Sequence, residues 1–508
     1  MAKIVNWVKH NRKEFWILVF ILAVAAFCRL YKIDQYMTFL GDEGRDVIVV
    51  RRIFTELHPP LIGPGTSVGN MYLGPLYYYM MAPALLLADF SPVGPAVLVA
   101  VLGVITVGFV WWVGREWFPA KDGQGRISWA GLIAAGLYAI SPTVIIYSHS
   151  SWNPNIMPFF ALLSVYSIWR VWKNREYKWL IVLGVAYAFV LQSHYLGLLL
   201  APTLLIFWYL SRAPKRYALY AASIFVVLMS PLLIFDLRHN FMNAKALYTL
   251  IASHDGTVSI SVRQLITKIP GVLNQINVSL VGGSNLVIGE IVSMVFLIVL
   301  MALIYINVVK RRSLKKVNPA VYLLFSWLFF GLIGFAFYKL PIYDHYFGFL
   351  FPVPFLIIGA VGQSIQSNKN LLAKIVFYVF CFGLVAVNLL NNPLRYAPNK
   401  QLARSQDVSK FILGKAQGQP FDLAVLAERN YEDGYRYFLE LWGGTVMHAD
   451  RWDQKTIVNQ LFVVCELEEK KCDPTHSSKA EVANFGMSKV EDWWEVAGVN
   501  IYKLSHRL

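Results

Sequence analysis

A cluster of ionisable residues follows the first long apolar run of the chain, at Gly41 to Asp46, which reads GDEGRD. Three carboxylates and an arginine so close to a predicted membrane span indicate a functional site, because charged groups are unfavourable beside lipid. One carboxylate can act as a general base while a second orients it or binds a metal ion. Two carboxylates acting on one sugar are disfavoured, because neighbouring helix residues point in different directions. We predict that one of Asp42 and Glu43 is a catalytic base and that the other is its partner.

The acidic motif opens an amphipathic segment, Asp42 to Leu57. Its apolar residues recur at helical spacing with arginines between them, which is typical of a helix that lies on a membrane surface. The prolines at positions 59 and 60 end this helix. A purely structural role for Asp42 stays open, because Asp is a preferred N-cap residue and acids stabilise the first turn of a helix.

Further polar side chains lie next to the ends of predicted spans and are candidates for substrate binding. They are Arg45, His149, Asn153, His194, Arg238, His239, Asp344, His345 and Tyr346. They converge on one site if the spans bundle around a cavity that opens outward; independent loop residues are the alternative. The histidines at 149, 194 and 345 are also candidate ligands of a divalent metal ion together with Asp42 or Glu43. No local spacing motif supports such a metal site, and no other cofactor is predicted.

The composition excludes an ordinary soluble protein. The 508 residues are 57% hydrophobic and 15% charged, where a globular domain has about 25% charged residues, and the mean hydropathy is +0.49. Apolar runs of the length that a membrane helix needs recur from Phe15 to about Leu390. The net charge of +16 does not indicate nucleic acid, because the basic residues cluster in short loops where they set orientation and meet anionic lipid headgroups.

We predict eleven membrane spans. They are Glu14–Tyr31, Pro95–Val113, Ser128–Tyr147, Ile156–Trp172, Trp179–Ser193, Tyr195–Leu210, Tyr217–Phe235, Leu286–Val309, Ala320–Tyr338, Tyr346–Ile365 and Ile375–Leu390. Basic residues precede the first span, which places the N-terminus in the cytoplasm, and every alternate loop is basic. A full span at Met71–Leu87 would break this alternation, so this segment is predicted to be a second surface or re-entrant helix. The C-terminus is then external.

Residues 392–508 differ in composition from the rest and predict a small extracytoplasmic α/β domain after a membrane domain of residues 1–391. Short buried strands are predicted at Phe421–Leu426, Gly444–His448 and Leu461–Cys465, with helices at Asp407–Leu413 and Asp433–Leu441. Cys465 and Cys472 can form a disulfide if this domain lies outside the cytosol.

The order of these elements resembles the GT-C glycosyltransferases. In particular, the chain resembles the protein O-mannosyltransferase and aminoarabinose-transferase branch and the RgtA/B/C/D-like proteins. The shared elements are a first span, an external Asp-Glu motif that opens a surface helix, a Pro-Pro and Gly-Pro aromatic segment, and a span ending in basic residues. The resemblance covers about Phe15 to Leu390. It implies an α-helical membrane fold and a polyprenyl-phosphate sugar donor, with transfer that inverts the anomeric centre. It also implies that Asp42, the first acid of the pair, is the catalytic base.

Two loops depart from the family pattern. Where many relatives have an Asp in the second external loop, residues 148–155 read SHSSWNPN, with Asn153 or Asn155 as the positional equivalent. The last external loop has Asp344-His345-Tyr346 in place of an Arg-Tyr pair. A histidine there can contact phosphate, with a charge that depends on pH.

The implied partners are the lipid-linked sugar donor, membrane lipids and an acceptor that is a lipid or a glycan, with a protein acceptor also open. A transporter or flippase for a lipid-linked sugar is the main alternative. Such transporters tend to show paired repeats and broken helices, and the sequence reveals neither. A noncatalytic envelope scaffold is a further alternative, in which Asp42 is only a helix cap.

Overall fold

The computed structural model describes residues 7–66, 71–120, 127–252, 262–305, 318–338, 340–367, 370–450 and 452–507. The chain divides into two compact units. The helical unit comprises Met1–Tyr31, Pro60–Met81 and Val97–Ala397; the α/β unit comprises Lys32–Pro59, Ala82–Ala96 and Pro398–Leu508. The division after Ala397 lies close to the predicted domain boundary at residue 391. The α/β unit also includes two earlier segments, and one of them contains the acidic motif.

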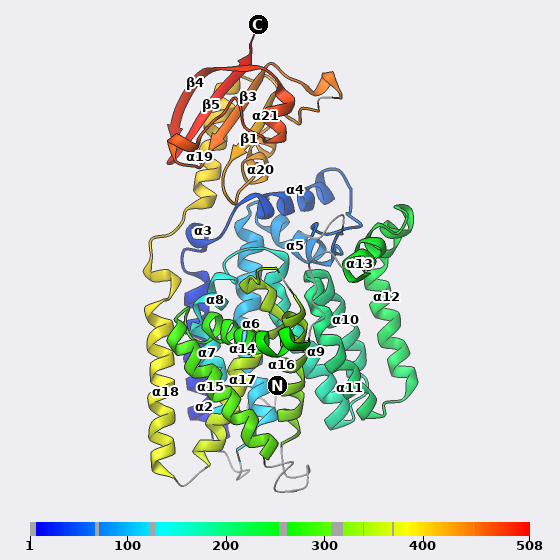
Figure 1. Ribbon diagram of the computed structural model, residues 1–508, viewed down its shortest axis with the longest axis vertical. Coiled ribbons are helices and arrows are strands. Elements are labelled where there is room, and N and C mark those ends of the chain that lie inside the picture. The colour runs from blue at the N-terminus through cyan, green and yellow to red at the C-terminus, as the bar shows by residue number, and fades with distance from the viewer. Residues whose placement is uncertain are drawn as a thin grey trace. The chain divides into compact units, whose positions relative to one another are not determined.

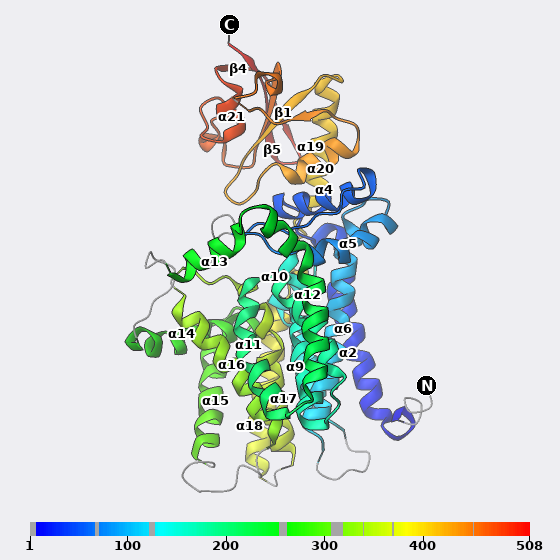
Figure 2. The ribbon, with the colours of Figure 1, turned by 90° about the vertical axis from the view of Figure 1, so that its right-hand side faces the viewer.

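The helical unit consists mainly of helices, and α10 packs against both α9 and α12 (Figure 2). Its elements, of which α5 and α6 continue into the α/β unit, are α2 (Arg12–Leu30), α5 (Leu76–Leu87), α6 (Val93–Trp117), α7 (Trp129–Ile140), α8 (Pro142–Ile146), η1 (Asn153–Ile156), α9 (Met157–Asn174), α10 (Trp179–Ser193), η2 (Tyr195–Leu200), α11 (Ala201–Ser211), α12 (Lys215–Arg238), α13 (Met242–Ala252), α14 (Val262–Leu280), α15 (Leu286–Ile304), α16 (Pro319–Phe337), η5 (Asp344–Leu350), α17 (Pro352–Gln366), α18 (Leu371–Leu390) and η6 (Pro393–Arg395).

Four helices in the described part of the chain are long and apolar enough to cross a membrane: α6, α12, α16 and α18. The pair η5 and α17, bent by 53°, is a fifth candidate, and several shorter apolar helices accompany them. The chain is therefore an integral membrane protein. A helix or a bent helix pair is present at each of the eleven predicted spans, but the count of eleven stays a prediction. With 12 residues, α5 is shorter than the about 20 that a span needs.

The predicted span Ser128–Tyr147 is broken into α7 and α8. Pro142 forces the preceding residue, Ser141, into an extended conformation with φ −61° and ψ 121°. Arg29, which is fully buried on α2, donates from Nη1 to the carbonyl of Ala139 at 2.9 Å. A positive charge at the C-terminal end of α7 stabilises the carbonyls that the break leaves without helical partners. The sequence revealed neither this break nor the bend between η5 and α17. Broken helices also occur in transporters, so they do not separate the two functional alternatives.

The α/β unit contains a five-stranded sheet with the strand order β2-β1-β3-β5-β4 (Figure 1). β1 pairs in parallel with β2 and β3, whereas β5 is antiparallel to both β3 and β4. The elements of this unit are α3 (Ile33–Tyr36), α4 (Gly41–Thr55), α19 (Gln401–Ala416), β1 (Phe421–Leu426), α20 (Asp433–Leu441), β2 (Val446–Met447), η7 (Gln454–Thr456), β3 (Gln460–Cys465), η8 (Glu469–Lys471), α21 (Ala480–Phe485), β4 (Ser488–Val496) and β5 (Val499–His506).

Both faces of this sheet are covered. Val408 and Ile412 of α19 and Leu439 of α20 pack with alternate residues of β1 and β3 on one face. Val482 and Phe485 of α21 pack with the intervening residues on the other face. Every residue of β1 and β3 is buried, as expected for parallel strands covered on both sides.

The predicted strands β1 and β3 and the helices α19 and α20 are confirmed. Where a buried strand at Gly444–His448 was predicted, β2 has only two half-buried residues, and the hairpin β4–β5 was missed. Its two-residue turn has positive φ at both Ala497 (50°) and Gly498 (78°), which is the geometry of a tight hairpin turn. Ala-Gly is a weaker turn signal than Asn-Gly, and most of β4 is exposed, so its residues lack the apolar alternation of a half-buried strand. Cys465 at the end of β3 forms a disulfide with Cys472.

Candidate functional site

The acidic motif forms the first turn of α4. Leu40 precedes the helix in an extended conformation, and its N–H donates to Glu43 Oε2 at 3.1 Å. The N–H of Gly41 donates to Asn430 Oδ1 at 2.9 Å. Glu43 and Asn430 therefore satisfy backbone donors that a helix N-terminus leaves unpaired. Asp42 is the second residue of the helix, so it is not the N-cap, but it lies in the first turn, where an acid stabilises a helix. This part of the structural alternative stays open.

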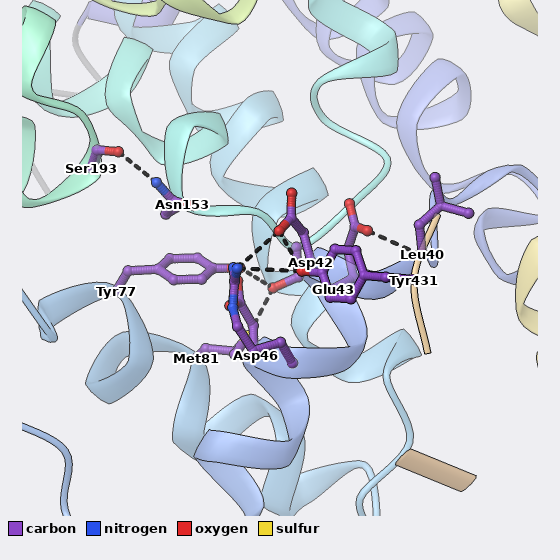
Figure 3. A network of polar contacts seen from close by, with 11 residues as sticks. Leu40, Asp42, Glu43, Asp46, Tyr77, Met81, Asn153, Ser193 and Tyr431 are labelled. Carbon is purple, nitrogen blue, oxygen red and sulfur yellow. Dashed lines mark hydrogen bonds and ion pairs between the residues drawn. The ribbon is translucent and has the colours of Figure 1, made fainter. Parts of the chain in front are cut away.

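Asp42 is held through one of its two carboxylate oxygens (Figure 3). Its Oδ1 accepts hydrogen bonds from the hydroxyl of Tyr431 at 2.6 Å and from Arg45 Nη1 at 2.9 Å. Arg45 also donates from Nη2 to Asp46 Oδ1 at 2.8 Å, and Asp46 is fully buried. The side chain of Asp42 is 42% exposed, and among the described residues no hydrogen bond reaches its Oδ2. This oxygen is available to accept a proton from a bound molecule.

Glu43 is buried and turns back toward Leu40, away from Asp42. Burial, together with the neighbouring charges of Asp42 and Asp46, raises the pKa of its carboxyl to about 7, against the opposing effect of the Leu40 N–H. Its observed contact is therefore structural, as a cap of α4. The prediction that Glu43 orients Asp42 is not supported by a hydrogen bond between them in the described residues.

Tyr431 and Asn430 come from the loop that follows β1. This loop leaves the carboxyl end of a buried parallel strand, where ligand-binding residues commonly gather in α/β sheets. Asn430 Nδ2 donates to Glu466 Oε1 at 2.6 Å, and Glu466 directly follows β3. Burial and the nearby Asp42 carboxylate raise the pKa of the Tyr431 phenol well above its usual value, so it stays a neutral donor. Sequence reasoning missed both residues; the polar run after β1 (ERNYED) was the available signal.

Glycines allow the α4 helix to come close to this loop. A Cβ added at Gly41 would lie 2.4 Å from the ring of Tyr431, and one at Gly44 would lie 2.3 Å from the backbone of Asp433. Glycine within a helix costs about 0.5–1 kcal/mol relative to alanine. The two glycines of GDEGRD are therefore explained by packing against the segment 431–434, which sequence reasoning did not foresee.

In the helical unit, two predicted binding residues are buried in structural contacts. His149 Nε2 lies 2.8 Å from the carbonyl of Cys28 and donates to it. Asn153 Nδ2 donates to the carbonyl of Ser193 at 2.7 Å (Figure 3). Burial lowers the pKa of His149 to about 4, so its ring is neutral near pH 7. These contacts position the loop between α8 and η1.

Three other predicted residues are brought together. The ring centroids of His194 and Tyr346 are 5.1 Å apart, and those of His345 and Tyr346 are 4.6 Å apart. Trp152 also contacts His345, with centroids 4.6 Å apart. Loss of solvent and the nearby His345 lower the pKa of His194 to about 3. The tip of the α10–η2 turn and the start of η5, which begins at Asp344, thus form one aromatic and imidazole cluster.

Arg238 and His239 lie at the C-terminal end of α12. Both are exposed, and the ring of His239 stacks on Phe235 with centroids 4.0 Å apart. Its Nδ1 also lies 2.8 Å from the carbonyl of Phe235. The exposed guanidinium of Arg238 is a candidate for contact with an anionic group.

The candidate metal ligands do not gather into a recognisable centre. Across the described ranges of the chain, no group of three or more His, Cys, Asp or Glu side chains lies close enough to hold a metal ion. His149 donates from Nε2 and His194 accepts from the N–H of Leu196 through Nδ1, so each has one ring nitrogen in a structural bond. A divalent metal stays a prediction that these contacts do not support.

The fold is similar to that of solved membrane enzymes. ArnT from Cupriavidus metallidurans, in a structure bound to undecaprenyl phosphate, matches with a TM-score of 0.56 and 13% identity over 96% of this chain and 97% of that chain. Its apo structure matches with a TM-score of 0.57 and 11% identity over the same shares. The chain has an ArnT-like fold. The predicted fold class is confirmed in this respect, together with the small C-terminal sheet.

A further solved structure shares this fold, and a family model matches part of the chain. The archaeal oligosaccharyltransferase AglB from Archaeoglobus fulgidus, in complex with an inhibitory peptide and a dolichol-phosphate, matches with a TM-score of 0.53 and 15% identity over 90% of this chain and 70% of that chain. The family model described as dolichyl-phosphate-mannose-protein mannosyltransferase matches residues 73–235. No curated protein matches this chain significantly.

Proposed function

We propose that this GT-C-like protein is a membrane glycosyltransferase that moves a sugar from a polyprenyl-phosphate donor to an acceptor, with Asp42 as the general base. The observation that carries the proposal is the half-exposed Asp42 carboxylate, anchored through Oδ1 by Arg45 and Tyr431. The mannosyltransferase family match and the fold shared with ArnT and AglB support a lipid-linked donor.

The proposed reaction is a single displacement. Asp42 Oδ2 takes the proton of an acceptor hydroxyl as that oxygen forms a bond to the anomeric carbon of the sugar. The bond between this carbon and the phosphate oxygen breaks, and its electron pair leaves with the lipid phosphate. Attack from the side opposite the leaving group inverts the anomeric centre. General-base assistance of this kind contributes about 10²–10⁴-fold to the rate.

The leaving phosphate gains negative charge, which cations and hydrogen-bond donors must stabilise. We assign donor binding to the cluster of His194, His345 and Tyr346 and to the exposed Arg238. Of the other predicted substrate-binding residues, Arg45 and His239 carry hydrogen-bond donors. His149 and Asn153 are held in structural contacts, and the carboxylate of Asp344 would repel a phosphate. A lipid or glycan acceptor is proposed, with protein as a further acceptor class. Loss of transfer on treatment with a chelator would reveal a divalent metal requirement.

We propose that transfer occurs on the extracytoplasmic side, with the N-terminus in the cytoplasm. The disulfide between Cys465 and Cys472 supports an oxidising environment for the α/β unit, because cytosolic thiols are kept reduced. The basic residues of alternate loops support the same orientation through the positive-inside rule.

The test is the substitution Asp42→Asn in the purified full-length protein reconstituted in liposomes. The probes are radiolabelled undecaprenyl-phosphate sugars, offered one at a time with membranes of the expressing cells as the acceptor source. Sugar transfer should fall at least 100-fold, the lower end of the general-base contribution, while binding of the labelled donor is retained. Asp34→Asn is the matched control, because Asp34 is an exposed aspartate of the same unit, and it should leave transfer unchanged.

Two outcomes contradict the proposal. Full transfer by the Asp42→Asn protein rejects Asp42 as the base. Movement of the labelled lipid between leaflets by a wild-type protein that transfers no sugar assigns the protein to the transporters.

A further inference from the structure

We propose that Tyr431 is a positioning residue that holds the Asp42 carboxylate with Oδ2 turned toward the acceptor. The inference deepens the proposed function and rests on Asp42 being the base. Tyr431 lies 389 residues beyond Asp42 in the sequence, in the C-terminal part of the chain. The C-terminal fold would then complete the catalytic base.

The geometry at Oδ1 carries this inference. Tyr431 donates at 2.6 Å and Arg45 at 2.9 Å to the same oxygen, which limits rotation of the carboxylate about its own bond. Arg45 divides its hydrogen bonds between two carboxylates, because its Nε and Nη2 both donate to Asp46 Oδ1. The short bond from Tyr431 is therefore the donor dedicated to Asp42. A base that is already held in one orientation needs less reorganisation when the acceptor binds, which lowers the free-energy cost of reaching the reactive geometry.

Tyr431 is itself fixed by a chain of contacts that begins at the sheet. Asn430 Oδ1 accepts from the N–H groups of both Tyr431 and Gly41, each at 2.9 Å. Asn430 Nδ2 donates in turn to Glu466, whose N–H donates to the carbonyl of Leu426 at the end of β1. One amide side chain thus sets the position of the tyrosine relative to the start of α4.

The charges around Asp42 explain why a neutral donor is suitable here. On α4, Glu43 and Asp46 are negative when ionised, and Arg45 is positive. In the segment that packs against α4, Tyr431 faces Asp42. Asp433 of the same segment lies near Arg45. A second arginine or a lysine would bind the same oxygen but would compete with Arg45 for the acids. A phenol adds a strong hydrogen bond without adding charge.

The test is Tyr431→Phe in the reconstituted full-length protein, assayed with the donor sugar that the wild type transfers. We expect kcat to fall about tenfold with KM for the donor unchanged. Tyr437→Phe is the matched control: Tyr437 is a buried tyrosine of the same unit whose hydroxyl donates to the carbonyl of Phe90.

A second variant guards against simple loss of folding. Fluorotyrosine incorporated at position 431 keeps the ring and makes the phenol a stronger donor, so kcat should be at least that of the wild type, with KM for the donor unchanged. A wild-type kcat in Tyr431→Phe, with transfer still abolished by Asp42→Asn, would overturn this inference alone. Transfer that survives Asp42→Asn would instead overturn the proposed function.

Discussion

Gly44 on α4 packs directly against the backbone of Asp433 at the start of α20. A Cβ placed on Gly44 would lie 2.3 Å from the carbonyl carbon of Asp433, closer than real Cβ atoms approach another atom. The first turn of α4 therefore reaches the 431–434 segment only because position 44 has no side chain. The contacts of Asp42 with Tyr431 depend on this approach.

Replacing Gly44 by alanine is expected to lower the free energy of unfolding by about 1–3 kcal/mol, because the new methyl group overpacks the contact with Asp433. This loss occurs although alanine favours the helix by up to about 1 kcal/mol. Sugar transfer should fall as well, since α4 carries Asp42. Thermal unfolding in detergent and the transfer assay measure the two effects.

The matched control is Gly414→Ala in α19. Gly414 is exposed, and a Cβ there meets no atom within 4 Å, so alanine should stabilise this unit by up to about 1 kcal/mol. A Gly44→Ala protein as stable and as active as Gly414→Ala would show that the close approach is not needed.

We expect the buried carboxyl of Glu43 to make the free energy of unfolding depend on pH. Burial raises the pKa of its carboxyl from an ordinary value of 4.5 to about 7, so the folded protein binds this proton more tightly than the unfolded chain does. The stabilisation is complete below about pH 4.5 and is lost as the pH rises through about 7. The loss amounts to about 3 kcal/mol. Glu43→Gln keeps an oxygen for the Leu40 N–H and should remove this dependence.

Thermal unfolding of wild type and Glu43→Gln between pH 5 and pH 8 provides the measurement. The variant should be the more stable protein at pH 8, and the two should approach each other at pH 5. Glu428→Gln, at an exposed position of the same unit, should follow the wild-type curve. Parallel curves for wild type and Glu43→Gln would refute the predicted proton binding.

We expect the stability of the α/β unit to depend on whether the disulfide between Cys465 and Cys472 is intact. It closes a loop across a sequence separation of 7, so its loss should cost about 2 kcal/mol, the lower end of the usual range. Reduction with dithiothreitol should lower the Tm of the wild type and leave a variant lacking both Cys465 and Cys472 unchanged. An equal response of the two proteins to dithiothreitol would argue against a stabilising bridge.

The sequence alone predicted most helices and the central strands, because hydrophobic periodicity is a local property. α10 and α20 have the predicted bounds, and so does β1. The acidic motif and its helix were likewise evident, since charge beside an apolar run is unfavourable without a function.

The tertiary structure decided which residues meet. The hydroxyl of Tyr431 reaches Asp42 across 389 residues because the carboxyl ends of β1 and β3 place the 427–432 loop beside α4. The role of Glu43 as a cap, the break at Ser141 and the β4–β5 hairpin are local features that sequence reasoning nevertheless missed. Periodicity reports which face of an element is buried, whereas partners far apart in the chain are chosen only when the elements pack together.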